Sequence, residues 1–280
     1  MKKLVWSILF TAIFFSTWAQ IQIPAASPAG SVSTTVGLTD IKIDYFRPRI
    51  KGRTIFANDP KALIPYGAIW RTGANSGTKI SFSDDVSVEG TAVPKGEYLI
   101  FTWPGEKEWS ISLYKDISLG GNTGKYDEKQ EAAKFKIKPE KLTEKVETLT
   151  FQIGDLSDDN TSAKIQLAWE NTSVKFTVKV DFDKKVMEAI KANTKVNPSS
   201  YYQAAVYYLE TGKDLKQALE WINASNPGTY WMLYQKALIQ KGLGDKKGAT
   251  ETAKASLEAA KKAKNRDYER MNEDLIKSLK

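Results

Sequence analysis

Arginine and aromatic side chains gather in one stretch of the sequence, between Arg47 and Asn75. Residues 44–80 contain seven basic side chains and only two acidic ones. Proline and glycine interrupt the stretch, which indicates a loop held in a defined conformation. A guanidinium group presents a planar set of donors that matches a carboxylate, sulfate or phosphate, and aromatic rings can wall such a pocket. We predict a ligand-binding loop formed by Arg47, Lys51, Arg53, Tyr66, Trp70, Arg71 and Asn75.

A structural role explains the same residues. In that interpretation Trp70 is buried and Arg71 pairs with a carboxylate such as Asp44. Gly73 then adopts a positive φ, and Asn75 bonds the backbone. Both interpretations stay open, and they are compatible, because a rigid corner can also hold a ligand.

The sequence contains no histidine and no cysteine. These residues supply the usual general base, the activated thiol, and the ligands of most zinc, copper and haem sites. A Ser-His-Asp triad, a Cys-His dyad and a disulfide are therefore excluded. Asp84 and Asp85 fit a polar turn, and 155–160 lacks the spacing of a calcium-binding EF-hand loop. We predict no catalytic residue, no metal site and no cofactor.

The first residues resemble an export signal. Lys2 and Lys3 precede an apolar run from Leu4 to Phe15, and small residues follow up to Ala19. We expect a signal peptide at 1–19 with cleavage near Ala19. About a dozen apolar residues are too few to span a bilayer of roughly 30 Å, and no second such run follows, so no membrane span is expected in the mature chain. The expected location is periplasmic or otherwise extracytoplasmic.

Hydrophobic periodicity divides the rest of the chain. Residues 20–30 fit a lead-in tether, and 31–183 show short period-two segments separated by turns, which indicates an antiparallel β-sandwich domain. From 184 to 280 the period changes to 3.6, which indicates helices. We therefore predict an α+β fold: an antiparallel β-sandwich followed by an α-helical domain. The expected strands are 31–36, 41–45, 78–82, 86–89, 97–103, 109–115, 132–138, 147–153, 164–169 and 175–182.

The helical domain contains an internal repeat. The motif that begins at Asn197 recurs at Asn226, and the segment 214–218 recurs at 245–249. This spacing resembles tetratricopeptide-like helical hairpins, with Ala218 and Ala249 at the small packing position. Residues 185–280 carry 17 basic and 11 acidic side chains. A solvated lysine face explains this excess, because no basic-aromatic signature of nucleic-acid binding accompanies it.

Three motifs in the β-rich part carry a family resemblance: Arg47-Pro-x-x-Lys-Gly-Arg53, Pro65-Tyr-Gly-x-x-Trp-Arg-Thr-Gly-Ala-Asn75, and Val93-Pro-Lys-Gly-Glu-Tyr98. They resemble domain-of-unknown-function family 2911, exported proteins found largely in Bacteroidota, over about residues 27–180. The resemblance implies a β-rich exported domain. It implies no activity, so no catalytic residue is transferred.

The leading hypothesis is an exported, non-catalytic binding protein. Its basic-aromatic loop would hold an anionic or glycan ligand, and its helical repeats would contact another envelope protein. Two alternatives stay open: an enzyme that uses Asp and Glu on cell-envelope or carbohydrate substrates, and a structural envelope scaffold. Two carboxylates opposed across a cleft would favour the enzyme, whereas arginines that converge without carboxylates would favour binding.

Overall fold

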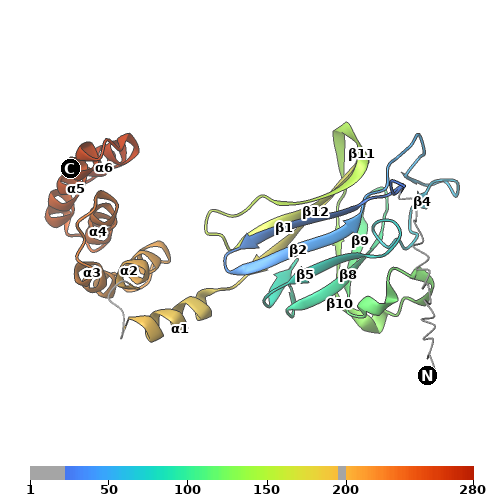
Figure 1. The fold of residues 1–280 in the computed structure, drawn as a ribbon, viewed down its shortest axis with the longest axis horizontal. Helices are drawn as coiled ribbons and strands as arrows, with labels where there is room; N and C mark the ends of the chain where they lie inside the picture. The colour runs from blue at the N-terminus through green and yellow to red at the C-terminus, as the bar shows by residue number, and fades with distance from the viewer. Residues whose placement is uncertain (1–22, 195–199) are drawn as a thin grey trace, which may run out of the picture. The chain divides into compact units, whose positions relative to one another are not determined.

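The structure is a computed structural model that describes residues 23–194 and 200–280. The predicted signal peptide, its cleavage site and the first repeat's Asn197 lie outside the described residues. The chain divides into two compact units between Asp181 and Phe182. Figure 1 shows strands throughout the first unit and helices throughout the second.

The first unit contains two antiparallel sheets. One has the strand order β1-β2-β5-β8-β9-β10 and the other β11-β12-β6-β7, and β3 and β4 form a small parallel pair beside them. The strands are β1 Ala29–Val36, β2 Thr39–Phe46, β3 Phe56–Ala57, β4 Ile64–Pro65, β5 Thr78–Phe82, β6 Val86–Val88, β7 Thr91–Val93, β8 Gly96–Trp103, β9 Trp109–Tyr114, β10 Glu131–Ile137, β11 Glu140–Gly154 and β12 Ser162–Val180.

The core of the first unit lies between the two sheets. Side chains alternate along a strand, so Ile41, Ile43 and Tyr45 of β2 all point inward and are buried. The register Ile43↔Ile80 continues this inner face into β5. From the second sheet, Val174, Phe176 and Val178 of β12 are buried, and burial of such faces is the main favourable term in folding.

Short 3₁₀ turns cover the outer face of β8 and β9. They are η1 Ile117–Leu119, η2 Thr123–Lys125 and η3 Glu128–Gln130. An aspartate or asparagine side chain caps each turn by accepting a backbone N–H bond. Under these turns, Phe101 meets Tyr114 and Tyr126 edge to face, which buries the outer face of β8.

The second unit consists of α-helices packed as antiparallel neighbours. The helices are α1 Asp183–Asn193, α2 Ser200–Glu210, α3 Leu215–Ala224, α4 Tyr230–Gly242, α5 Lys246–Lys262 and α6 Arg266–Ser278. Asp214 and Asp245 cap α3 and α5. Ala218 and Ala249 are fully buried, because a small side chain lets two helices approach closely.

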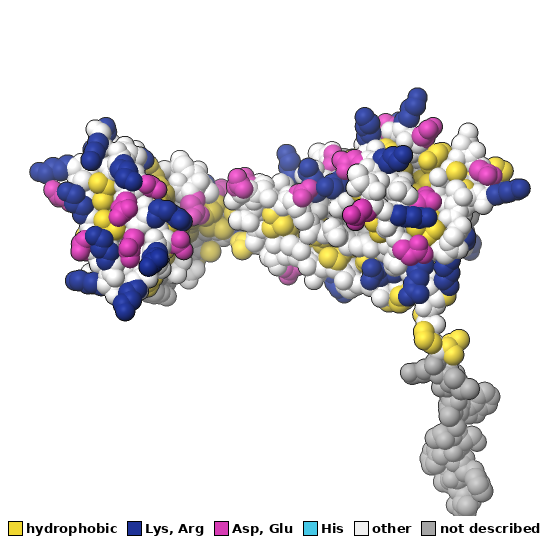
Figure 2. All heavy atoms as spheres, turned by 90° about the horizontal axis from the view of Figure 1, so that it is seen from above, with side chains coloured by type: hydrophobic (Ala, Val, Ile, Leu, Met, Phe, Trp, Pro, Cys, Tyr) yellow, Lys and Arg dark blue, Asp and Glu magenta, His cyan; other side chains and the backbone are white. Residues whose placement is uncertain are grey.

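The predicted fold class, an α+β chain with an antiparallel β-sandwich followed by helices, is confirmed. The similarity of the helical hairpins to tetratricopeptide repeats stays a prediction. Among the described residues, no helix is both long and apolar enough to cross a membrane. On the face seen in Figure 2, acidic and basic side chains are interspersed over both units.

Candidate functional site

The predicted loop is fixed to the first sheet by its backbone. Trp70 and Thr102 of β8 exchange two backbone hydrogen bonds, of 2.8 and 2.9 Å. The indole Nε1 of Trp70 donates to the carbonyl of Gly73 at 3.0 Å, and Thr78 donates its hydroxyl to the carbonyl of Thr72 at 2.6 Å. These contacts set the direction in which Arg71 leaves the sheet.

The conformation of this corner differs from the prediction at Gly73. The positive φ angles fall on Thr72, at 59°, and on Asn75, at 56°, and not on Gly73. Gly73 is needed for space, because a Cβ there would lie 2.9 Å from the hydroxyl oxygen of Thr78. Asparagine tolerates the left-handed region better than most residues, which suits its place in the turn.

A second loop presses directly against this corner. The N–H of Gly77 donates to the carbonyl of Gly120 at 3.0 Å. A Cβ on Gly121 would lie 2.7 Å from the nitrogen of Gly77 and 3.1 Å from Cδ of Arg71. Two glycines therefore let the backbones touch, and their contact supports the stem of Arg71.

The corner and four other segments of the first unit line a partly open cavity of about 330 Å³, which we call the arginine cavity. No acidic side chain lines it. Its charged, polar and aromatic lining residues are Ser27, Arg53, Trp70, Arg71, Asn75 and Trp169. Four of them, Arg53, Trp70, Arg71 and Asn75, belong to the set predicted from sequence, so the structure brings these four together.

Both arginines of the cavity keep unused donors. Arg71 donates one hydrogen bond, from Nη1 to the carbonyl of Asn75 at 2.9 Å. Arg53 donates from Nε to the carbonyl of Ile50 at 3.0 Å and from Nη2 to that of Arg49 at 2.6 Å. A guanidinium carries five N–H donors, and neither arginine pairs with a carboxylate in the part of the chain that the structure describes. The remaining donors are available to an anion.

Aromatic rings form the floor of the arginine cavity. Trp70 stacks on Trp169 with ring centroids 5.7 Å apart and an interplanar angle of 22°. Their exposed fractions are 8% and 1%, so the rings are firmly packed. Phe56 contacts both tryptophans and also Trp109. We call these four side chains, Phe56, Trp70, Trp109 and Trp169, the aromatic cluster.

Arg47 lies elsewhere and joins the two sheets. Its Nε and Nη2 groups lie 3.4 Å from the carbonyl of Leu149 and the hydroxyl of Thr150, both on β11. Its stem crosses Gly30 of β1, where a Cβ would lie 2.7 Å from Cδ of Arg47. Arg47 therefore links the sheets and does not line the arginine cavity.

Lys51 and Tyr66 also lie outside the arginine cavity. Lys51 sits in an exposed turn with φ of 50°. Tyr66 lines a different cavity of about 350 Å³ with Trp109, Glu106 and Glu140, which we call the carboxylate cavity. Burial raises the pKa of Tyr66, and the charges of Glu106 and Glu170 raise it further. The residues predicted from the sequence as one site therefore lie in four places in the first unit.

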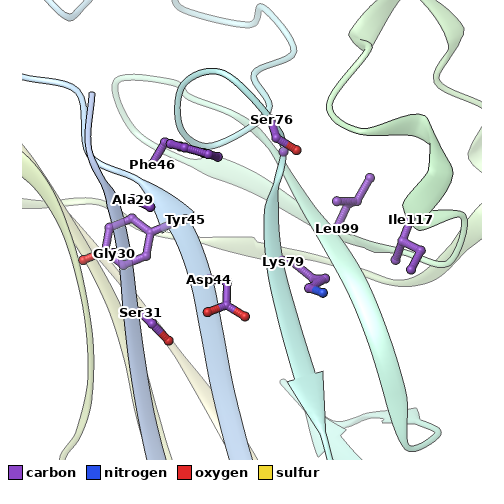
Figure 3. Close-up of a pocket in the computed structure, with 11 residues that line it drawn as sticks. Ala29, Gly30, Ser31, Asp44, Tyr45, Phe46, Ser76, Lys79, Leu99 and Ile117 are labelled. Atoms are coloured by element: carbon purple, nitrogen blue, oxygen red, sulfur yellow. The ribbon is translucent and has the colours of Figure 1, made fainter. Parts of the chain in front are cut away.

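Asp44 is not the partner of Arg71. Its carboxylate pairs with Lys42 at 2.9 Å on the outer face of β2. Burial alone would raise the pKa of Asp44, but hydrogen bonds from Lys42 and Ser31, with the charge of Lys79, lower it overall. Asp44 and Lys79 line an open groove of about 560 Å³ over β1, β2 and β5, which we call the sheet-face groove (Figure 3).

Sequence reasoning missed one polar and one aromatic residue of the arginine cavity, besides its apolar lining. Trp169 reaches it from β12, and Ser27 reaches it from the segment before β1, where its carbonyl accepts a 3.3 Å bond from Nδ2 of Asn75. Trp169 occupies an inward position in an alternating strand. That pattern predicts burial, and no local signal shows which loop the ring meets.

The acidic segment 155–160 forms a turn. Asp159 accepts bonds from the hydroxyls of Ser157 and Thr161 at 2.6 and 2.8 Å, which lower its pKa to about 2. Asp155 pairs with Lys175 at 3.4 Å. Within residues 23–194 and 200–280, no group of three or more acidic side chains is placed to hold a metal ion.

The aromatic residues of the helical unit mostly pack against each other. Tyr208 meets Trp221 edge to face at 4.8 Å, and Tyr268 contacts both Tyr230 and Tyr234. Trp231 is 40% exposed, which leaves one large ring on the surface of α4. This pattern fits a helix core with a small exposed aromatic surface.

The sequence profile of the family described as "Protein of unknown function (DUF2911)" matches residues 27–178. The chain belongs to the DUF2911 family. The family assignment made from the arginine and glycine motifs is therefore confirmed, and the matched region includes every residue of the arginine cavity. No curated protein and no solved structure matches the chain.

Proposed function

We propose that this DUF2911 protein is an exported, non-catalytic binding protein whose β-sandwich holds an anionic ligand in the arginine cavity. The observation that carries the proposal is the lining: Arg53 and Arg71 have unused donors, and no acidic side chain shares the cavity. An unpaired guanidinium fork beside an aromatic floor suits a carboxylate, sulfate or phosphate group on a small organic ligand or glycan. Export rests on the signal-like residues 1–19.

The enzyme alternative has weaker support. Glu106 and Glu140 both line the carboxylate cavity. Both side chains are exposed to solvent. A carboxylic acid that donates a proton near neutral pH needs burial in an apolar pocket, and neither glutamate has it.

Thermal unfolding of the full chain with glucuronate, citrate, phosphate and sulfate tests the ligand proposal. A ligand at roughly 100 times its dissociation constant stabilises the folded state by about 2.7 kcal/mol, which raises the melting temperature by several degrees. Arg71→Ala and Arg53→Ala should remove this shift.

Arg49→Ala is the matched control, because it removes the same charge from an exposed side chain outside the cavity. It should keep the shift. If no anion raises the melting temperature of the wild type, or if Arg49→Ala acts like Arg71→Ala, the proposal is wrong.

We further propose that the helical hairpins contact a partner protein of the envelope. The support is the exposed ring of Trp231 on α4 and the exposed side chain of Met271 on α6, since aromatic and methionine side chains are enriched at interfaces. A photo-crosslinking residue at position 231 should capture one defined partner in cells, and the same residue at the exposed position 254 should not. Equal labelling at both positions would contradict this.

A further inference from the structure

The arginine cavity and the sheet-face groove share two segments of chain. Asn75 lines the cavity, and the next residue, Ser76, lines the groove. Likewise Ser27 lines the cavity and Ala29 lines the groove. The Asn75 side chain bonds the carbonyl of Ser27 across this junction. The two hollows therefore adjoin, with the Asn75–Ser27 contact at their boundary.

The groove runs away from this junction across the open face of the sheet. Figure 3 shows Ser76 and Phe46 at one end, and Asp44 and Lys79 further along. Leu99 and Ile117 form its other side. Its volume of about 560 Å³ exceeds that of the cavity, and both fall in the range of ligand pockets.

The chemistry of the groove differs from that of the cavity. Its charged groups are already paired: Asp44 with Lys42 at 2.9 Å, and Lys79 with Glu97 at 2.9 Å. Phe46, Leu99 and Ile117 supply the apolar part of the lining. A second anion would meet the Asp44 carboxylate without a free cation to oppose it. A neutral unit with both hydroxyl and C–H faces fits this lining.

We propose that the ligand is an acidic oligosaccharide whose terminal uronic acid binds in the arginine cavity and whose neutral sugar units extend along the sheet-face groove. This inference rests on the proposed function, because the arginine cavity holds the acidic end. The neutral units add contact area in the groove but no charge. Affinity therefore rises with the number of neutral units.

Calorimetric titration of the full chain tests this with a length series: glucuronate alone, then glucuronic acid linked to one, two or three xylose units. We expect the dissociation constant to fall at least tenfold from glucuronate to the compound with two xylose units. An oligogalacturonate series, charged at every unit, should gain much less with length.

Two variants locate the effect. Ser76→Trp fills the junction and Ile117→Ala removes groove contact, and both positions are exposed, so the fold should tolerate the changes. Both should reduce the gain with length and keep glucuronate binding. Leu38→Ala is the matched control, since Leu38 is exposed outside both hollows.

The outcomes separate the two proposals. If every compound of the xylose series binds with the same affinity as glucuronate, the extended ligand is overturned and the anion site stays intact. An equal gain of affinity with length in the oligogalacturonate series has the same consequence. Length dependence that survives Ser76→Trp also overturns it. Binding of none of the compounds, with no anion shift in thermal unfolding, overturns the proposed function itself.

Discussion

The arginine cavity and the carboxylate cavity border the same aromatic cluster and present opposite charges. Trp70 and Trp169 line the first cavity, and Trp109 lines the second. The charges come from the loops, since Arg71 follows Trp70 in one loop and Glu106 lies in the turn between β8 and β9. A shared buried core can thus support two surfaces of different chemistry, because loop residues change without disturbing the packing beneath them.

Removal of the shared core should have the largest effect. Trp169→Ala deletes a ring that is 1% exposed and stacked on Trp70, and such truncations cost about 3–5 kcal/mol. Urea unfolding should show this loss, and the anion response should vanish with the floor of the cavity. If the anion response stays intact in a destabilised protein, the cavity does not depend on the aromatic cluster.

A smaller loss of stability should follow from a change in the loop contact that supports Arg71. Gly121→Ala places a methyl group 2.7 Å from the nitrogen of Gly77, at a φ of 91° that disfavours side chains. We expect a cost of about 1–3 kcal/mol and weaker anion binding. Gly90→Ala is a control with a similar φ of 84° and no neighbour within 4 Å. Gly90→Ala should keep wild-type anion affinity. If it loses as much affinity as Gly121→Ala, the Gly121 contact does not support Arg71.

Arg47→Met should separate structural from ligand-facing arginines. It removes the bonds to Leu149 and Thr150 and keeps much of the stem, so we expect a cost of about 1 kcal/mol in unfolding experiments. Anion binding should be unchanged. Arg71→Met should show the reverse: little change in stability and no anion response. If Arg47→Met and Arg71→Met change stability and anion binding in the same way, the two arginines do not differ in role and this comparison is wrong.

The smallest expected effect concerns Tyr66 in the carboxylate cavity. Burial and then the charge of Glu106 raise its pKa above the ordinary value near 10. A raised pKa in the folded state gives stability that is complete below about pH 10 and lost as pH rises through the folded pKa. Glu106→Gln should lower the folded-state pKa of Tyr66 and so make this loss of stability smaller.

Alkaline titration of phenol absorbance, with Tyr66→Phe used to isolate the signal, measures that change. Glu108→Gln is a suitable control, because Glu108 pairs with Lys136 at 2.7 Å and does not line the cavity. An unchanged Tyr66 titration in Glu106→Gln would show that the charge of Glu106 does not contribute to the pKa of Tyr66.

Local pattern predicted the features of the molecule that depend on neighbouring residues. The alternation of Ile41, Ile43 and Tyr45 predicted β2 and its inward face. The arginines, glycines and aromatics around Trp70 predicted the corner that lines the arginine cavity, because sequence neighbours in a tight turn stay close together. Periodicity therefore located the sandwich, and local composition located part of the candidate site.

Long-range packing decided the rest. Arg47 crosses to β11 because Gly30 of β1 leaves room for its stem. The residues next to Arg47 in the sequence do not indicate this contact. The two segments predicted at 164–169 and 175–182 form one strand, β12, since β11 pairs with it on both sides of Glu170, whose φ is positive at 56°. The short strand β7 was missed because three residues are too few for a periodic signal.

The continuous strand β12 has a mechanical consequence. It ends at Val180, and α1 begins at Asp183, so a pull on the helical part reaches the sandwich through this strand and, when directed along it, loads the strand lengthwise. Its neighbours β11 and β6 bond it along its sides, which places those hydrogen bonds in shear. Bonds loaded in shear must break together, whereas a peeled edge strand breaks one pair at a time. Such a pull would therefore leave the arginine cavity folded until the whole of β12 slides past its neighbours.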